Sequence, residues 1–127
     1  MAGVRSHEEL IAWKLSNELK LHVYSLLKSG SVVRDYDFCD QLRRSASSAP
    51  RNIAEGFGRY LPGDFIRYLR FANGELKETH DALQDGVDRG HFTIDQIVPL
   101  QRLGKRASKA ATNLIAYLEK NRLNRTF

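Results

Sequence analysis

The chain has 127 residues, of which 42% are hydrophobic and 28% charged, enough for one domain with a buried core. No apolar run approaches the ~20 residues of a membrane span, and the N-terminus lacks the apolar region of a secretion signal. We therefore expect a cytoplasmic protein without a membrane partner, and the single Cys39 excludes an intrachain disulfide. The net charge of +5 favours an acidic partner such as nucleic acid.

The N-terminal half of the chain predicts two helices. Ser6 and Glu9 have the spacing of a capping box, which starts a first helix that stops before Gly30. A short polar linker follows. Asp37 is the expected N-cap of the second helix, which ends near Gly56.

The C-terminal half predicts two more helices. Pro62 suits the first turn of a third helix, which stops at Gly90. Thr93 and Gln96 form another capping box at the start of the fourth helix, and Pro99 follows about two turns later. The expected helices span residues 7–29, 37–57, 62–89 and 94–121 of a single domain, 1–127. Their short connections predict an all-α, up-down antiparallel four-helix bundle.

The first predicted helix carries two apolar stripes on roughly opposite sides. A bundle core buries only one stripe of a helix, so the second stripe should meet another surface. Tryptophan and tyrosine are typical anchors of such interfaces. The predicted oligomer interface consists of Leu10, Trp13, Leu21 and Tyr24. The alternative is that both stripes pack against neighbouring helices of the same chain.

A proline lies inside the second predicted helix. Pro50 removes one backbone hydrogen bond, at a cost of roughly 3 kcal/mol, so its neighbours are expected to repair the bend. We expect Asn52 to bond the carbonyl that lacks its donor, and Glu55 to pair with Arg51. Gly56 is expected to end the helix in the left-handed conformation. This segment is therefore interpreted as a structural motif.

Two sets of basic residues are candidates for binding nucleic-acid phosphates. One set forms a ridge on the outer face of the fourth helix, and the other lies along one side of the second helix. The predicted contacts are Arg44, Arg51, Arg59, Arg102, Lys105, Arg106 and Lys109. The alternative for the ridge is a solvated face, or one that pairs with acidic residues of a neighbouring subunit.

Patterns that would indicate catalysis or metal binding are weak. Glu75, Glu78 and His80 lack the Glu-x-x-His spacing of a di-iron bundle, and His91 falls in a loop. Cys39 has Arg43 one turn away, but a half-buried structural cysteine is the favoured interpretation. The sequence therefore predicts no catalytic residue, no metal site and no cofactor, and the protein is interpreted as non-enzymatic.

Several motifs together resemble one family. They are Leu10-x-x-Trp13, Gln41-Leu-Arg-Arg-Ser45, Ser48-x-Pro50-x-Asn52-Ile-Ala-Glu-Gly56 with Arg59, Phe65-x-x-Tyr68-Leu69-x-x-Ala72-x-Gly74-x-Leu76, and Leu114-Ile115-x-x-Leu118. The chain resembles bacterial four-helix bundle proteins first noted as reading frames in intervening sequences of large-subunit ribosomal RNA genes. That family is similar in fold to the accessory variability protein of diversity-generating retroelements. This relative forms a basic pentameric barrel that binds its reverse transcriptase and nucleic acid.

The resemblance implies a cyclic homo-oligomer, a pentamer by analogy, with RNA or DNA and a reverse transcriptase or other protein as possible partners. It supplies no catalytic residue, because the family has no established activity. The sequence thus favours a non-enzymatic, oligomeric helical bundle that associates with nucleic acid through a basic surface. The alternative is a scaffold or protein-interaction module in which the ridge serves subunit or partner contacts.

Overall fold

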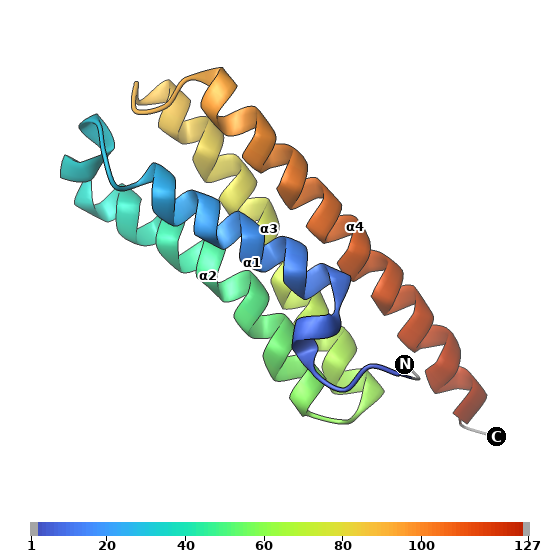
Figure 1. Ribbon diagram of the computed structural model, residues 1–127. Coiled ribbons are helices and arrows are strands. Elements are labelled where there is room, and N and C mark those ends of the chain that lie inside the picture. Colours follow the sequence, from blue (N-terminus) through green and yellow to red (C-terminus); the bar gives the residue numbers. More distant parts are fainter. Residues whose placement is uncertain (1–2, 126–127) are drawn as a thin grey trace.

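The computed structural model describes the backbone of residues 3–125 and the side chains of residues 3–122. Four long helices run alternately up and down (Figure 1), and no strand occurs in the described part of the chain. Two short 3₁₀ helices precede the first two long ones. The elements are η1 (His7–Glu9), α1 (Ile11–Leu26), η2 (Ser31–Arg34), α2 (Tyr36–Gly58), α3 (Pro62–Asp88) and α4 (Ile94–Arg125). The all-α prediction with four helices is confirmed.

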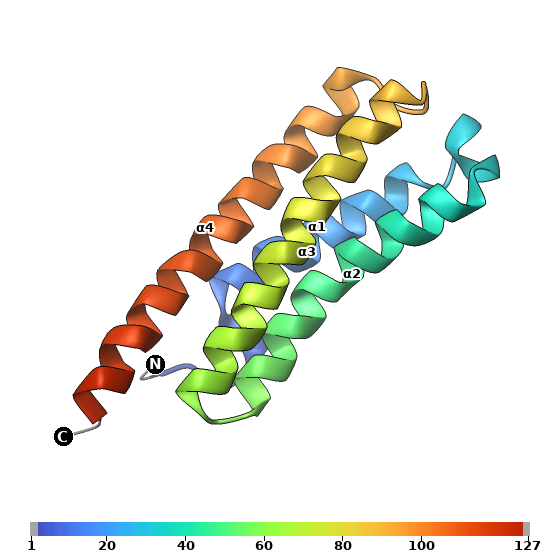
Figure 2. The same cartoon turned by 180° about the vertical axis from the view of Figure 1, so that it is seen from behind.

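The order of the helices around the bundle places α2 and α4 on opposite corners. α1 packs against both α2 and α4 on one side, and α3 packs against both on the other (Figures 1 and 2). The α1–α2 and α3–α4 connections lie at one end of the bundle, whereas the α2–α3 connection lies at the other. Residues that are distant in sequence are therefore brought together at each end.

The core consists of two clusters of buried residues stacked along the bundle axis. The cluster near the α1–α2 and α3–α4 connections includes Phe38, Leu83 and Phe92. The cluster near the α2–α3 connection includes Ile53 and Phe65. Alanines occupy fully buried helix positions between the large side chains, and this lets the helices approach closely. These alanines are Ala46, Ala49, Ala72, Ala107 and Ala111.

The capping box expected at the first helix does not form, and α1 starts later than predicted. The side chain of Ser6 makes no capping hydrogen bond, and the Glu9 carboxylate instead accepts from the backbone N–H of Arg5 at 3.0 Å. Residues 7–9 form the 3₁₀ turn η1, and Leu10 is extended before α1 begins at Ile11. The helix ends at Leu26 rather than at residue 29, with Gly30 in the left-handed region (φ 85°).

The starts of the other helices follow the predictions more closely. The N-cap position of α2 is Asp35, not Asp37, because α2 begins at Tyr36. Pro62 is at the start of α3, as predicted. The second capping box is confirmed: Thr93 Oγ1 accepts from the Gln96 N–H at 3.1 Å, and Gln96 Oε1 accepts from the Thr93 N–H at 2.8 Å. α4 continues through Pro99 to Arg125, beyond the expected end.

The motif around Pro50 is helical throughout, and three of its expected details are corrected. Asn52 Nδ2 donates to the Ser48 carbonyl at 2.9 Å, four residues back, rather than to the carbonyl of residue 46 that Pro50 leaves without its donor. Glu55 bonds Arg59 at 3.1 Å instead of Arg51. Gly56 does not end the helix, which continues to Gly58.

Gly56 has a different structural role. A Cβ at this position would lie 2.7 Å from Cβ of Tyr68 and 3.0 Å from a ring carbon of Phe65, both on α3. Glycine is therefore needed for the close approach of α2 to α3. The left-handed residue in the following connection is Tyr60 (φ 66°).

Candidate nucleic-acid interface

The two predicted basic sets do not form one surface. One lies on α2 and the other on α4, and these helices occupy opposite corners of the bundle. A single straight phosphate backbone therefore cannot contact both sets on one monomer. Each set is therefore a separate candidate surface for phosphate binding.

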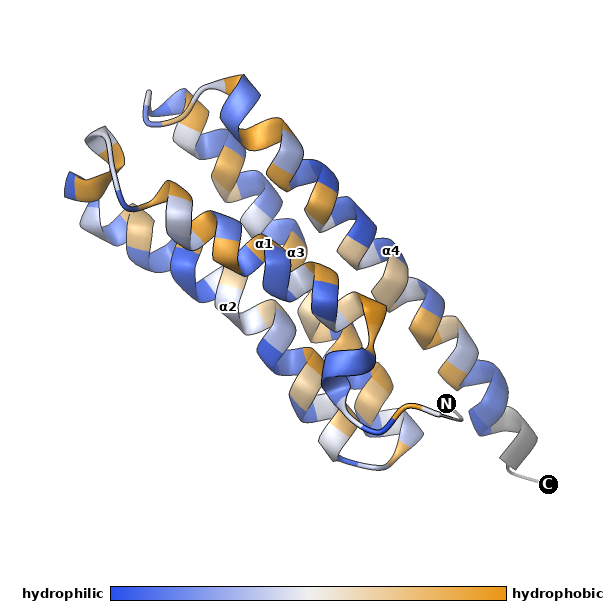
Figure 3. Ribbon diagram, in the orientation of Figure 1, coloured by the Kyte–Doolittle hydropathy of each residue, from blue (hydrophilic) through white to orange (hydrophobic). Residues whose placement is uncertain are grey.

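The α4 set has the properties of a binding surface. Its residues are spaced i, i+3, i+4 and i+7, so they share one side of the helix, and all four are exposed. Hydrophilic stretches alternate with hydrophobic ones along α4 (Figure 3). Among the described residues none of the four forms an ion pair with an acidic side chain. We call Arg102, Lys105, Arg106 and Lys109 the α4 ridge.

The three arginines of the α2 set have different environments. Arg59 is held by α2 and α3, because it bonds Glu55 at 3.1 Å and the Tyr68 hydroxyl at 2.8 Å, and its guanidinium lies 5.0 Å from the Tyr68 ring centroid. Arg51 lines a hollow between α1 and α2. Arg44 is exposed. Of the predicted α2 set, Arg59 is therefore already engaged within the chain.

The predicted oligomer-interface residues have unequal exposure. Leu10 is buried in the core of its own chain, which corrects its placement on an outer stripe. Leu21 is 56% exposed, whereas Trp13 and Tyr24 are half-buried beside α2. Ile11, the first residue of α1, is 67% exposed. The 3₁₀ turn before α1 accounts for the inward position of Leu10, because Leu10 precedes the helix in an extended conformation.

Ile11 borders an apolar groove between α1 and α4. The groove has a volume of about 830 Å³ and is lined by Leu15 and Ala12 on α1 and by Leu114 and Ala110 on α4. Arg106 and Lys109 of the α4 ridge form part of its rim. The ridge thus adjoins an apolar surface.

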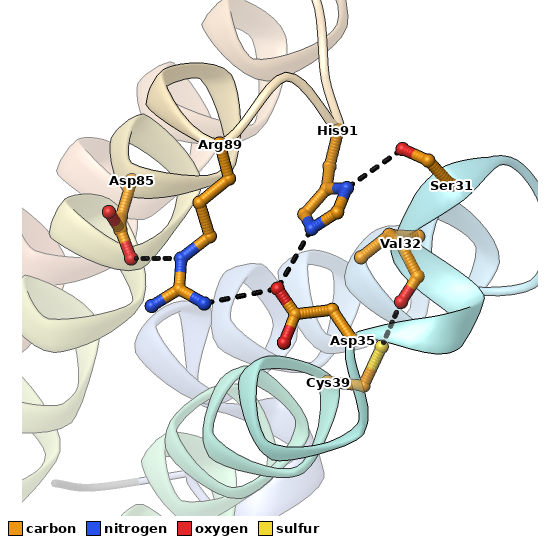
Figure 4. Close-up of polar contacts among 7 residues, drawn as sticks. All are labelled: Ser31, Val32, Asp35, Cys39, Asp85, Arg89 and His91. Atoms are coloured by element: carbon orange, nitrogen blue, oxygen red, sulfur yellow. Dashed lines mark hydrogen bonds and ion pairs between the residues drawn. The ribbon is translucent and has the colours of Figure 1, made fainter.

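A hydrogen-bonded cluster that the sequence did not predict joins the two connections at one end of the bundle. His91 lies between Ser31 and Asp35 (Figure 4), with Nδ1 2.8 Å from the Ser31 Oγ and Nε2 2.8 Å from the Asp35 Oδ2. The same Asp35 oxygen accepts from Arg89 at 3.0 Å, and Arg89 also donates to Asp85 at 2.9 Å. Because an ionised carboxylate only accepts hydrogen bonds, Nε2 of His91 is the donor to Asp35.

The electrostatics of this cluster favour the ionised form of Asp35. The hydrogen bond from His91, followed by that from Arg89, holds the pKa of Asp35 below its ordinary value, against the opposing effect of desolvation. Asp35 makes no side-chain capping bond to α2, since its carboxylate is directed to these partners. The cluster therefore fastens η2 to the α3–α4 connection.

The cluster has the residue types of a hydrolase triad, but its surroundings favour a structural role. A triad also requires oxyanion donors and a substrate cleft next to the serine. The groove between α1 and α4 and the hollow between α1 and α2 are both lined by other residues. The sequence could have indicated that Ser31 and Asp35 lie near His91, because the first and third connections of an up-down bundle lie at the same end.

Cys39 is a buried structural residue. Its Sγ–H donates to the Val32 carbonyl at 3.1 Å, next to the cluster (Figure 4). Burial raises the pKa of this thiol, and the opposing effect of Arg43 is smaller. The structural role predicted for Cys39 agrees with this environment, but the residue is fully buried (2% exposed) rather than half-buried.

Comparison with known proteins places the chain in a family. The model of the 23S rRNA-intervening sequence protein family matches residues 8–113, which span η1 to most of α4. The chain belongs to the 23S rRNA-intervening sequence protein family. The resemblance noted in its motifs is therefore confirmed.

A solved structure supports the fold of this member of the 23S rRNA-intervening sequence family. The chain is similar in structure to a protein of unknown function from the S23 ribosomal protein family of Bacteroides thetaiotaomicron, whose crystal structure matches with a TM-score of 0.75 and 23% sequence identity. The similarity covers 84% of this chain and 96% of that one. No curated protein matches the chain significantly. Within the described residues, no helix is long and apolar enough to span a membrane.

Proposed function

We propose that this protein is a non-enzymatic helical bundle that associates with RNA or DNA through the α4 ridge. The observation that carries the proposal is the exposure of four cations on one side of α4, without an acidic partner in the described part of the chain. Further along α4, the acidic residue Glu119 pairs with Arg70 at 3.3 Å and not with the ridge. Lysine and arginine in this arrangement bind phosphates and release counterions.

This mode of binding depends on charge and not on base sequence. Exposed side chains on one helix face reach phosphate oxygens, whereas base readout requires an element that enters a groove. If all four ridge residues each neutralise one phosphate, the logarithm of the duplex association constant falls against the logarithm of salt with a slope of about −3.6. Membership in a family named for ribosomal RNA intervening sequences makes structured RNA a suitable first ligand.

The test is a titration of labelled structured RNA and duplex DNA at two salt concentrations. The double variant Arg102→Glu, Lys109→Glu should weaken binding and reduce the slope by about 2, since two phosphate contacts are lost. The matched control is Lys14→Glu, Lys28→Glu, which changes the net charge equally at exposed positions on and just after α1. An absence of binding at low salt, or equal losses in both double variants, would refute a role of the ridge.

A second candidate function is a scaffold that assembles into a cyclic homo-oligomer, a pentamer by family analogy. Its support is the apolar groove between α1 and α4, which the 67% exposed Ile11 borders. In this alternative, Arg106 and Lys109 at the groove rim contact a neighbouring subunit or a protein partner.

Light scattering at micromolar concentration tests the assembly. The proposal predicts a particle of about five times the 14.5 kDa of one chain. Ile11→Asp should dissociate it if the groove is the interface, and Leu21→Asp should do so if the outer stripe is the interface. Both positions are exposed, so neither change disturbs the core. A wild-type monomer would refute the assembly.

A further inference from the structure

A hollow of about 190 Å³ lies between α1 and α2, over the proline of the family motif. α1 contributes residues spaced i, i+4, i+7 and i+11, and α2 contributes residues spaced i, i+3, i+4 and i+7, so each helix presents one continuous side. The lining residues are Trp13, Asn17, Lys20, Tyr24, Ser47, Pro50, Arg51 and Ala54. Two aromatic rings and two cations thus converge on one small surface depression.

The antiparallel course of α1 and α2 orders these residues along the hollow. Trp13 lies at the end that contains Ala54, and Tyr24 lies at the end that contains Ser47. Lys20 and Arg51 fall between the two ends. Pro50 contributes to the lining of the hollow, and it has no backbone N–H to donate there.

The two aromatic rings are not equivalent. The Lys20 ammonium already lies over the Tyr24 ring, 6.0 Å from its centroid, so this ring holds a cation. The Trp13 ring is contacted by His7 in an edge arrangement, at a centroid distance of 5.2 Å. Trp13 lines the hollow and also packs against the core cluster that contains Ile53. Lys20 and Arg51 line the same hollow and supply positive charge.

We propose that this hollow binds an unpaired nucleobase of single-stranded nucleic acid, with the base on Trp13 and the adjoining phosphate on Lys20 and Arg51. An aromatic platform beside backbone-binding cations is the arrangement that recognises single strands, whereas a duplex keeps its bases stacked internally. Neither Lys20 nor Arg51 forms an ion pair with an acidic side chain among the described residues. Arg51 is therefore available to phosphate, and Lys20 binds phosphate by leaving its contact with the Tyr24 ring. This inference rests on the proposed nucleic-acid association and adds a second, base-dependent contact away from the α4 ridge.

The charge of the hollow argues against a second copy of the chain as its occupant. A subunit packed over Trp13 and Tyr24 would bury Lys20 and Arg51, so it would have to place an acidic side chain beside each of these two cations. An acidic peptide would satisfy the two cations but would leave the indole face unused. A nucleotide satisfies both features of the hollow.

The single tryptophan of the chain makes the test direct, because all indole emission comes from Trp13. Addition of an unstructured oligonucleotide should quench this emission. An abasic oligonucleotide of equal length, and polyglutamate, should not quench it, because they carry charge without bases. Equal quenching by either would overturn the proposal, and so would a change in emission that depends on protein concentration alone, which would assign the hollow to a second copy.

Binding measured by anisotropy of a labelled oligonucleotide gives an independent readout. Trp13→Leu should weaken single-strand binding between about fivefold and about 150-fold while leaving duplex binding unchanged. Lys20→Ala and Arg51→Ala should each reduce the single-strand salt slope by about 0.7, and Lys14→Ala, outside the hollow, should not. If single strands bind without quenching and all variants bind equally, this inference fails and the role of the ridge stands. If no nucleic acid binds at low salt, both fail.

Discussion

Asp35 and His91 are 56 positions apart in the sequence, yet Nε2 of His91 lies 2.8 Å from Oδ2 of Asp35. This bond joins the start of α2 to the α3–α4 connection, and Arg89 strengthens it with a second donor at 3.0 Å. The Arg89 guanidinium also lies 5.0 Å from the centroid of the buried Phe38 ring. The polar cluster is thus built onto the end of the core.

Replacement of Asp35 by Asn should lower the melting temperature, because the charge that faces Arg89 and His91 is lost. The effect should also depend on pH. The pKa of Asp35 is lower in the folded state than in the unfolded state. Ionised Asp35 therefore stabilises the folded protein at pH values above its unfolded-state pKa of about 3.9, and this stabilisation disappears as pH falls through its folded-state pKa. Urea midpoints of the two proteins should therefore differ at pH 7 and converge at strongly acidic pH.

Asp37→Asn is the matched control for this prediction. Asp37 is exposed in the first turn of α2, outside the cluster. A fall in melting temperature as large as that of Asp35→Asn would mean that helix-terminal charge, rather than the cluster, accounts for the effect.

Gly56→Ala should destabilise the fold by about 1–3 kcal/mol, because its new Cβ would be forced against Tyr68 and Phe65. Gly74→Ala is the opposite case: it lies in α3 with no atom within 4 Å of an added Cβ, so helix propensity should stabilise the protein by up to about 1 kcal/mol. Denaturant unfolding measures both. Similar changes for the two variants would show that close packing is not the reason for Gly56.

Ser16→Ala should raise the free energy of unfolding by about 1 kcal/mol. The Ser16 hydroxyl is buried in α1 and has no hydrogen-bond partner among the described residues, so its removal ends an uncompensated desolvation cost. Ser25→Ala on the exposed side of the same helix reports the gain from helix propensity alone. The buried variant should gain more; an equal or smaller gain would contradict the explanation.

Thr93→Ala should cost about 1 kcal/mol, because it removes the side-chain acceptor of the capping box at α4. Ser6→Ala should leave stability unchanged, since the Ser6 side chain makes no capping bond. Thermal unfolding of the two variants compares the Thr93–Gln96 capping box, which forms, with the Ser6–Glu9 pair, which has the same spacing but forms no capping box. A loss at Ser6 equal to that at Thr93 would contradict this distinction.

The sequence by itself determined the features that depend on neighbouring residues. Apolar periodicity predicted four helices, and Pro62 and the Thr93–Gln96 box marked two of their starts, because these signals act within one or two turns of the chain. The family motif was likewise legible without a structure. The exposure of the α4 ridge followed from helical spacing alone.

Only the tertiary structure decided which side chains meet across helices. It separated the α2 arginines from the α4 ridge, turned Leu10 inward, and assigned Gly56 to close packing against α3. It also brought Asp35 to His91, and Arg51 into the same hollow as Trp13. These relationships depend on the order and rotation of helices around the bundle axis, which residue spacing within one helix does not specify.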